Sequence, residues 1–189
     1  MKIRKLVVFA VVLISSYLLS SCLTCETKDY SFELNNQGGG KFTIKFNNIM
    51  SKKDKEELTK DEETTKDFEE LISKYIKETE MEKTFPDAKM VEKRLYAENG
   101  KLNGIVVFEF SKIDQVKLYQ YDKNSPFQYY LSSLSSESFS STNGKQAPDY
   151  FPVINWDKSL KKLTLTTKVT EVSNESTTSL LSVWEKNKK

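Results

Sequence analysis

Two cysteines, Cys22 and Cys25, are the most reactive side chains in this chain of 189 residues, and two residues separate them. A C-x-x-C spacing is typical of thiol–disulfide redox pairs, which need the motif at the start of a helix that follows a strand. Here the motif comes directly after an apolar leader, and no strand is predicted before it. We therefore expect no redox pair and interpret Cys25 as a lone thiol.

The sequence contains no histidine. This excludes imidazole-dependent catalysis, the common zinc sites and histidine-driven pH switching. Two cysteines also cannot supply a disulfide framework, an all-cysteine zinc site or an iron–sulfur cluster. Lys and Arg number 29 and Asp and Glu 27, which gives a formal charge of +2. Nothing in this balance indicates binding to nucleic acid, and we predict no cofactor and no metal.

Carboxylates, serines and lysines remain as candidates for catalysis. The acidic residues are concentrated in charged runs, and no pair of them stands out as the two carboxylates of a glycosidase. Ser159 and Lys162 have the S-x-x-K spacing of Ser–Lys enzymes, but we expect them in a hairpin, where an i, i+3 pair points to opposite faces. The triple glycine at 38–40 precedes a strand, whereas a phosphate-binding loop precedes a helix. We predict that the protein is not an enzyme.

Aromatic side chains are the strongest candidates for ligand binding. Tyrosine rings have an apolar face and a polar edge, which suits stacking on sugars or covering a lipid chain. Two interpretations stay open: the rings line a pocket for a lipid-like or glycan ligand, or they close the open end of a small sheet. The candidate residues are concentrated in one short segment and are Tyr119, Tyr121, Phe127, Tyr129 and Tyr130.

Residues 1–21 have the organisation of a secretory signal peptide. Met1–Lys5 is cationic, and an apolar run follows over Leu6–Leu19. As a helix this run would be about 21 Å long, which is too short to cross a hydrocarbon layer of about 30 Å. The leader ends in Leu19-Ser20-Ser21-Cys22.

This ending resembles the lipobox of bacterial lipoproteins, in which an aliphatic residue and two small residues precede the cysteine. The resemblance implies that signal peptidase recognises Leu19, Ser20 and Ser21, and that Cys22 becomes the acylated first residue. Two or three acyl chains hold a protein durably at a membrane. We therefore predict export and a lipid anchor in the cell envelope. In a Gram-negative host, Leu23 in place of Asp after the cysteine favours the outer membrane.

The rest of the chain is predicted to be a lipidated tether over residues 22–30 and a single α+β domain over residues 31–189. Alternation of apolar and polar residues indicates an antiparallel sheet of about three hairpins. Their turns are expected at Asn35–Gly40, at Asn99–Gly100, and at Asp157–Ser159 between the segments 151–156 and 160–172.

One clear amphipathic helix, packed on a face of the sheet, is expected over residues 65–79. A charged linker (51–67) precedes it, and a Ser-rich loop (132–144) comes later. Shorter helices are expected after Ser111 and over 180–184. The residues that define the apolar side of the long helix are Phe68, Leu71, Ile72, Tyr75 and Ile76.

The order of these elements is similar to that of small envelope lipoproteins of Bacteroidetes-type bacteria and, distantly, to the lipid-associated LppM-type domain. The similarity covers Phe32–Phe46, Phe68–Ile76 and Ile105–Val116, and it implies a fold without implying site residues. The predicted function is a lipid-anchored, non-enzymatic module that binds or assembles with an envelope partner. The alternative is a carrier of a lipid-like or glycan ligand.

Overall fold

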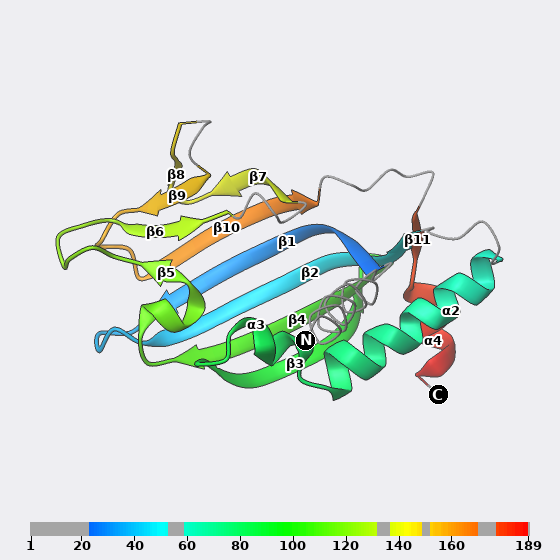
Figure 1. Ribbon diagram of the computed structural model, residues 1–189. Helices are drawn as coiled ribbons and strands as arrows, with labels where there is room; N and C mark the ends of the chain where they lie inside the picture. Colours follow the sequence, from blue (N-terminus) through cyan, green and yellow to red (C-terminus); the bar gives the residue numbers. More distant parts are fainter. Residues whose placement is uncertain (1–22, 53–58, 132–136, 149–151, 170–176, 189) are drawn as a thin grey trace, which may run out of the picture.

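The protein folds into two antiparallel sheets and several helices, an α+β fold as the sequence pattern predicts. Figure 1 shows a long, bent sheet with a smaller sheet near one end and helices near the other. The computed structural model describes residues 23–52, 59–131, 137–148, 152–169 and 177–188.

A seven-stranded sheet forms the body of the molecule, in the order β3-β4-β2-β1-β10-β7 with β11 paired to β2. Each neighbouring pair is antiparallel. The long central strands β1 and β2 therefore carry both the core and the site. The strands are β1 (Leu23–Leu34), β2 (Gly40–Lys52), β3 (Lys89–Glu98), β4 (Lys101–Phe110), β7 (Glu137–Thr142), β10 (Lys162–Val169) and β11 (Thr177–Ser179).

The first two predicted hairpins are confirmed as β1–β2 and β3–β4. In the first turn, the Asn35 side chain accepts hydrogen bonds from the backbone N–H groups of Gln37 at 2.9 Å and Gly39 at 3.0 Å. In the second turn, Asn99 and Gly100 have φ angles of 52° and 71°. Tight hairpin turns require this left-handed backbone, which Asn and Gly adopt more readily than other residues.

The tether expected over residues 22–30 is wrong, because from residue 23 onward this stretch belongs to β1. Its charged residues suggest a solvated segment, yet they find partners on neighbouring strands. The Lys101 ammonium donates to Glu26 at 2.6 Å, and the Asn47 amide donates to Asp29 at 2.8 Å. These contacts satisfy the polar groups, so the segment pairs within the sheet.

A second sheet of four strands, in the order β5-β6-β9-β8, packs against the large one. The third predicted hairpin is wrong, because β9 pairs with β6 and β8 while β10 pairs with β1 and β7. The turn at Asp157–Ser159 instead carries the chain from one sheet to the other. The strands are β5 (Leu118–Tyr119), β6 (Phe127–Tyr130), β8 (Lys145–Gln146) and β9 (Val153–Trp156).

The predicted Ser-rich loop over 132–144 is partly a strand. Residues 137–142 form β7, which pairs with β10 at the edge of the large sheet. The Thr142 hydroxyl donates to the backbone carbonyl of Thr164 at 2.6 Å. Small polar side chains of this kind are tolerated on an edge strand, where one side is solvated. The first part of the expected loop, 132–136, lies outside the described residues, and Asn143–Gly144 lie in the bend between β7 and β8.

The predicted amphipathic helix is present and begins earlier than expected. It comprises α2 (Lys60–Glu70), which continues as the π-helix η1 (Leu71–Lys77), and the short α3 (Glu80–Thr84) follows. Thr59 and Glu62 form a capping box at the start. The second half of the expected charged linker (51–67) is thus helical, and its residues 51–52 complete β2.

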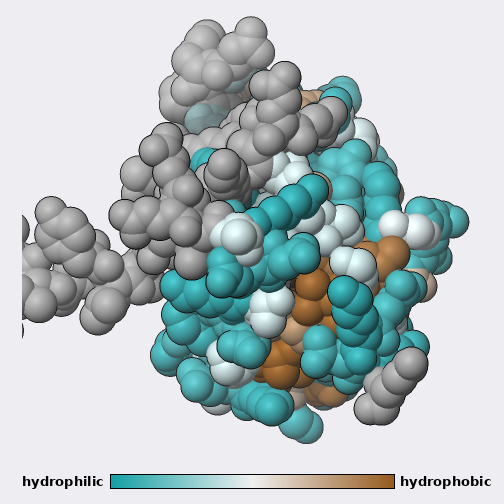
Figure 2. Space-filling view, turned by 90° about the vertical axis from the view of Figure 1, so that its right-hand side faces the viewer, coloured by the Kyte–Doolittle hydropathy of each residue, from teal (hydrophilic) through white to brown (hydrophobic). Residues whose placement is uncertain are grey.

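Two apolar clusters hold these layers together. The larger one lies between the two sheets and includes Phe32, Phe42 and Trp156, and the smaller one joins α2, η1 and the C-terminal helix to the sheet. The expected short helices are present as η2 (Ile113–Val116) and α4 (Leu181–Asn187). Figure 2, which faces the side of α2 and α4, shows a hydrophobic strip surrounded by hydrophilic surface.

Candidate functional site

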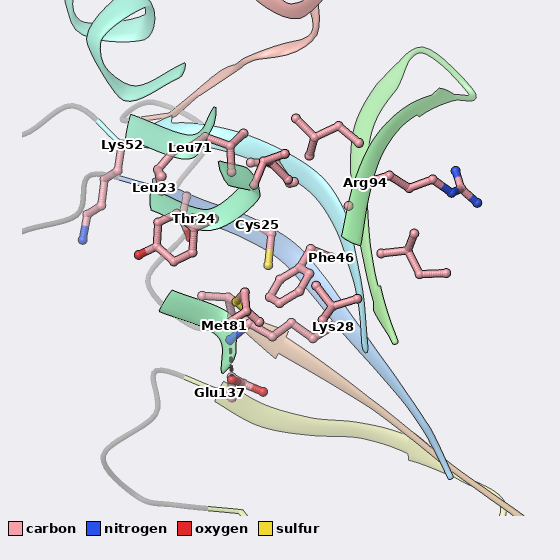
Figure 3. Close-up of a pocket in the computed structure, with 18 residues that line it drawn as sticks. Leu23, Thr24, Cys25, Lys28, Phe46, Lys52, Leu71, Met81, Arg94 and Glu137 are labelled. Atoms are coloured by element: carbon pink, nitrogen blue, oxygen red, sulfur yellow. Dashed lines mark hydrogen bonds and ion pairs between the residues drawn. The ribbon is translucent and has the colours of Figure 1, made fainter. Parts of the chain in front are cut away.

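A cavity of about 420 Å³ lies over the large sheet beneath η1 and α3, and we call it the Cys25 cavity (Figure 3). This volume falls within the range of about 300–1,000 Å³ that is typical of small-molecule sites. The sheet contributes the floor through β1, β2 and β4. The apolar side chains in its wall include Leu23, Phe46, Ile49, Leu71, Ile76 and Met81.

The cover of the cavity comes from the π-helical segment η1. Leu71, Tyr75 and Ile76 line the cavity from this helix. π-Helical turns are rare and frequently occur at functional sites. Gly104 also lines the cavity, and the packing there leaves little room for a side chain, since a Cβ atom would lie 3.1 Å from the Ile49 Cδ1 atom.

A partly buried ion pair lies at one end of the cavity. The Lys28 ammonium donates to Glu137 Oε1 at 2.6 Å, and the hydroxyls of Tyr30 and Thr167 donate to Glu137 Oε2 at 2.8 and 2.7 Å. Figure 3 shows Lys28 and Glu137 joined across the lower part of the cavity. We refer to these four residues as the Glu137 cluster. They bring together β1, β7 and β10.

The Glu137 cluster contains a carboxylate that stays ionised although it is buried. Burial by itself would raise the pKa of Glu137. The charge of Lys28 and the hydrogen bonds from Lys28, Thr167 and Tyr30 together outweigh burial, so this pKa lies below its ordinary value. Burial and the Glu137 charge raise the pKa of Tyr30 above its ordinary value. The phenol therefore remains protonated and acts as a donor.

The Cys25 thiol lies in the wall of the cavity and is 4% exposed. Burial raises the pKa of Cys25 to about 11, and the charge of Lys28 offsets only part of this effect. Because the thiolate is the reactive form, a thiol with such a pKa is a weak nucleophile at neutral pH.

The five aromatic residues singled out in the sequence separate into two groups. Phe127 is buried, and the Tyr129 ring lies 5.6 Å from that of Phe32, so these two belong to the core between the sheets. None of the five lines the Cys25 cavity. The exposed members are Tyr119, Tyr121 and Tyr130, at 55%, 79% and 58%.

Lys28 and Glu137 were not singled out from the sequence. A signal for Lys28 exists, because it alternates with Tyr30 and Phe32, which both point into the core. For Glu137 there is no local signal, since its partner lies 109 residues away along the chain. The predicted lipidation site Cys22 and its recognition residues Leu19, Ser20 and Ser21 lie outside the described residues.

The chain matches no protein family model, no curated protein and no solved structure. Among the residues that the structure describes, no helix has the length and apolar character needed to span a membrane. Within the same part of the chain, no group of three or more cysteine or acidic side chains is arranged to hold a metal ion.

Proposed function

We propose that this protein is exported, is anchored in the cell envelope by acyl chains on Cys22, and binds an apolar ligand in the Cys25 cavity without catalysis. The observation that carries the binding role is the cavity itself, with its mostly apolar wall. Two of its charged residues, Lys28 and Glu137, are bonded to each other. A set of groups already paired in this way suits binding better than proton transfer or nucleophilic attack.

The position of the cavity supports a link between anchor and ligand. Leu23 and Cys25 line the cavity, and Leu23 directly follows the proposed lipidation site Cys22. An apolar site beside the attachment point would face the membrane interface, where apolar ligands are concentrated. In a Gram-negative host we place this interface at the outer membrane, because Leu23 replaces the aspartate that favours retention at the inner membrane.

The anchor is tested by replacing Cys22. We expect Cys22→Ser to abolish labelling by a radioactive fatty acid in the native host and to move the protein out of the membrane fraction, because acyl chains are the proposed attachment. Cys25→Ser is the matched control and should leave both properties unchanged. Membrane association and labelling that survive Cys22→Ser would refute the anchor.

The binding site is tested by filling the cavity from its cover. We expect Ile76→Trp to weaken binding of a hydrophobic fluorescent dye by at least about tenfold, because the larger side chain occupies the space available to the ligand. Ile72→Trp is the matched control, since Ile72 lies on the same helix but lines a separate groove beside α4. Fluorescence titration of the purified variants gives both affinities. Equal weakening by the two variants, or by neither, would contradict this site.

A further inference from the structure

We infer that the ligand of the Cys25 cavity is an uncharged acyl ester, whose carbonyl oxygen accepts a hydrogen bond from Lys28 while its hydrocarbon chain lies along the apolar wall. This inference rests on the proposed function and names its ligand class. It is carried by the pairing of charges around the cavity, which leaves hydrogen-bond donors available but leaves no net charge at the Glu137 cluster.

The apolar wall sets the main part of the ligand. Phe46, Ile49 and Leu71 line the cavity from a strand and from the helix that covers it. Each methylene group that leaves water for such a wall adds to the binding free energy. A hydrocarbon chain gains most from such a wall, whereas a sugar would leave its hydroxyl groups without partners.

Lys28 supplies the polar contact. An ammonium group has three donors, and among the described residues only Glu137 receives a hydrogen bond from it. The Lys28 side chain is 25% exposed, whereas that of Glu137 is 8% exposed. Lys28 therefore has donors available on its exposed side, and the ligand can reach them.

The charge of Lys28 is already neutralised. Glu137 lies 2.6 Å from the ammonium and is held by the Tyr30 and Thr167 hydroxyls on its other oxygen. A ligand carboxylate that approached Lys28 would also approach this fixed carboxylate, and two like charges at short range destabilise each other. An ester carbonyl accepts the same hydrogen bond without that repulsion.

The other cationic residues of the cavity wall, Lys52 and Arg94, do not add positive charge at the place where the ligand meets Lys28. Figure 3 shows the side chains of Lys52 and Arg94 extending away from Cys25 on opposite sides. The Arg94 guanidinium is paired with Glu92 at 2.6 Å and lies over the Tyr96 ring. Neither head group is directed at the place where the ester would meet Lys28.

The experiment compares two ligands that share one chain length. Sodium dodecanoate and glyceryl monododecanoate compete with a fluorescent dye for the purified Cys22→Ser protein, below their critical micelle concentrations. We expect the ester to displace the dye at a concentration about tenfold lower than the carboxylate does, because Glu137 repels the ligand carboxylate and does not repel the ester. This comparison requires no substitution of a residue that lines the cavity.

A charge-neutralising variant reverses the preference. In Glu137→Gln the Lys28 charge is no longer compensated, so we expect dodecanoate to bind more than about tenfold more tightly than it binds the parent protein and to displace the dye at a lower concentration than the ester does. The matched control is Glu33→Gln, which breaks a cross-strand ion pair with Lys162 at an exposed place. This control should keep the preference for the ester.

Three outcomes separate this inference from the proposed function. Preference for the ester with reversal in Glu137→Gln supports both. Preference of the parent protein for dodecanoate overturns the uncharged ligand but keeps the binding site. If neither ligand displaces the dye, both the ligand class and the binding role are wrong. If Glu137→Gln fails to fold, the comparison of the two ligands on the parent protein still decides between a charged and an uncharged ligand.

The same chemistry has two sources, a membrane lipid or the acyl esters of the protein's own anchor on Cys22. These are distinguished by comparing lipidated protein from the native host with Cys22→Ser. If the anchor fills the cavity, only Cys22→Ser takes up added monododecanoate. If a membrane lipid fills the cavity, both proteins take up the ester once non-covalently bound lipid has been removed. Mass spectrometry of the Cys22→Ser protein purified from the native host then also detects a co-purified acyl ester.

Discussion

Phe42→Ala is expected to lower the free energy of unfolding by about 4 kcal/mol, the usual loss when a large aromatic side chain is removed from a core. Phe42 is fully buried, with its ring stacked 4.4 Å from that of Phe32 and edge-on to Phe85 at 5.2 Å. The small sheet and the turn after α3 both reach this cluster. Neither can move to refill the space without leaving its own contacts.

Urea unfolding followed by circular dichroism measures this effect. Tyr121→Ala is the control, because Tyr121 is 79% exposed, and it should change stability by less than about 0.5 kcal/mol. A loss below about 1 kcal/mol in Phe42→Ala would mean that this ring does not lie in the core as described.

Lys28→Met is expected to destabilise the protein by about 3 kcal/mol at neutral pH. The substitution keeps the length of the side chain but leaves the Glu137 carboxylate buried, with only the Tyr30 and Thr167 hydroxyls as partners. Removing one member of a buried pair typically has an effect of this size or somewhat larger, and the partial exposure of Lys28 reduces it.

The pH dependence of this difference has a definite sign. In the parent protein the pKa of Glu137 lies below its ordinary value, so the contribution of the pair is present above the ordinary pKa and is lost as the pH falls through the lower native one. Without Lys28, burial dominates and raises the native pKa. The variant then becomes more stable as the pH falls toward the ordinary pKa, and the gap between the two proteins narrows.

Urea unfolding of both proteins at about pH 7 and about pH 4 measures the size of the stability difference and the direction in which it changes with pH. Lys162→Met is the control, because the pair of Lys162 with Glu33 is exposed and contributes little at either pH. A gap in stability that stays constant or widens toward acid would show that Glu137 is not the buried, charge-compensated group described above.

Local features of the sequence were enough to predict several elements. The turns at Asn35–Gly40 and Asn99–Gly100 depend on backbone angles that Asn and Gly adopt by themselves. The helix around Phe68–Ile76 depends on a spacing that any amphipathic helix shows. Such signals lie within a few residues, so no distant part of the chain is needed to read them.

Two failures of prediction share one cause. The tether predicted at 23–30 is a strand, in which Glu26 and Asp29 are satisfied by side chains that come near only when the sheet forms. Similarly, apolar and polar residues alternate in β9 and β10 as they would in the two strands of a hairpin. The two strands belong to different sheets, which pack on the same core. Alternation identifies a strand and does not identify its neighbour.

The sequence by itself determined the α+β class, two hairpin turns and the main helix, and it predicts the lipid anchor at Cys22. Only the tertiary structure decided that Leu23 and Cys25 form the wall of a cavity, and that Lys28 meets Glu137 there. The physical reason is the range of the interactions. Backbone preference and periodicity depend on residues that lie a few positions apart in the sequence. The cavity and its ion pair form only when segments more than a hundred residues apart come together.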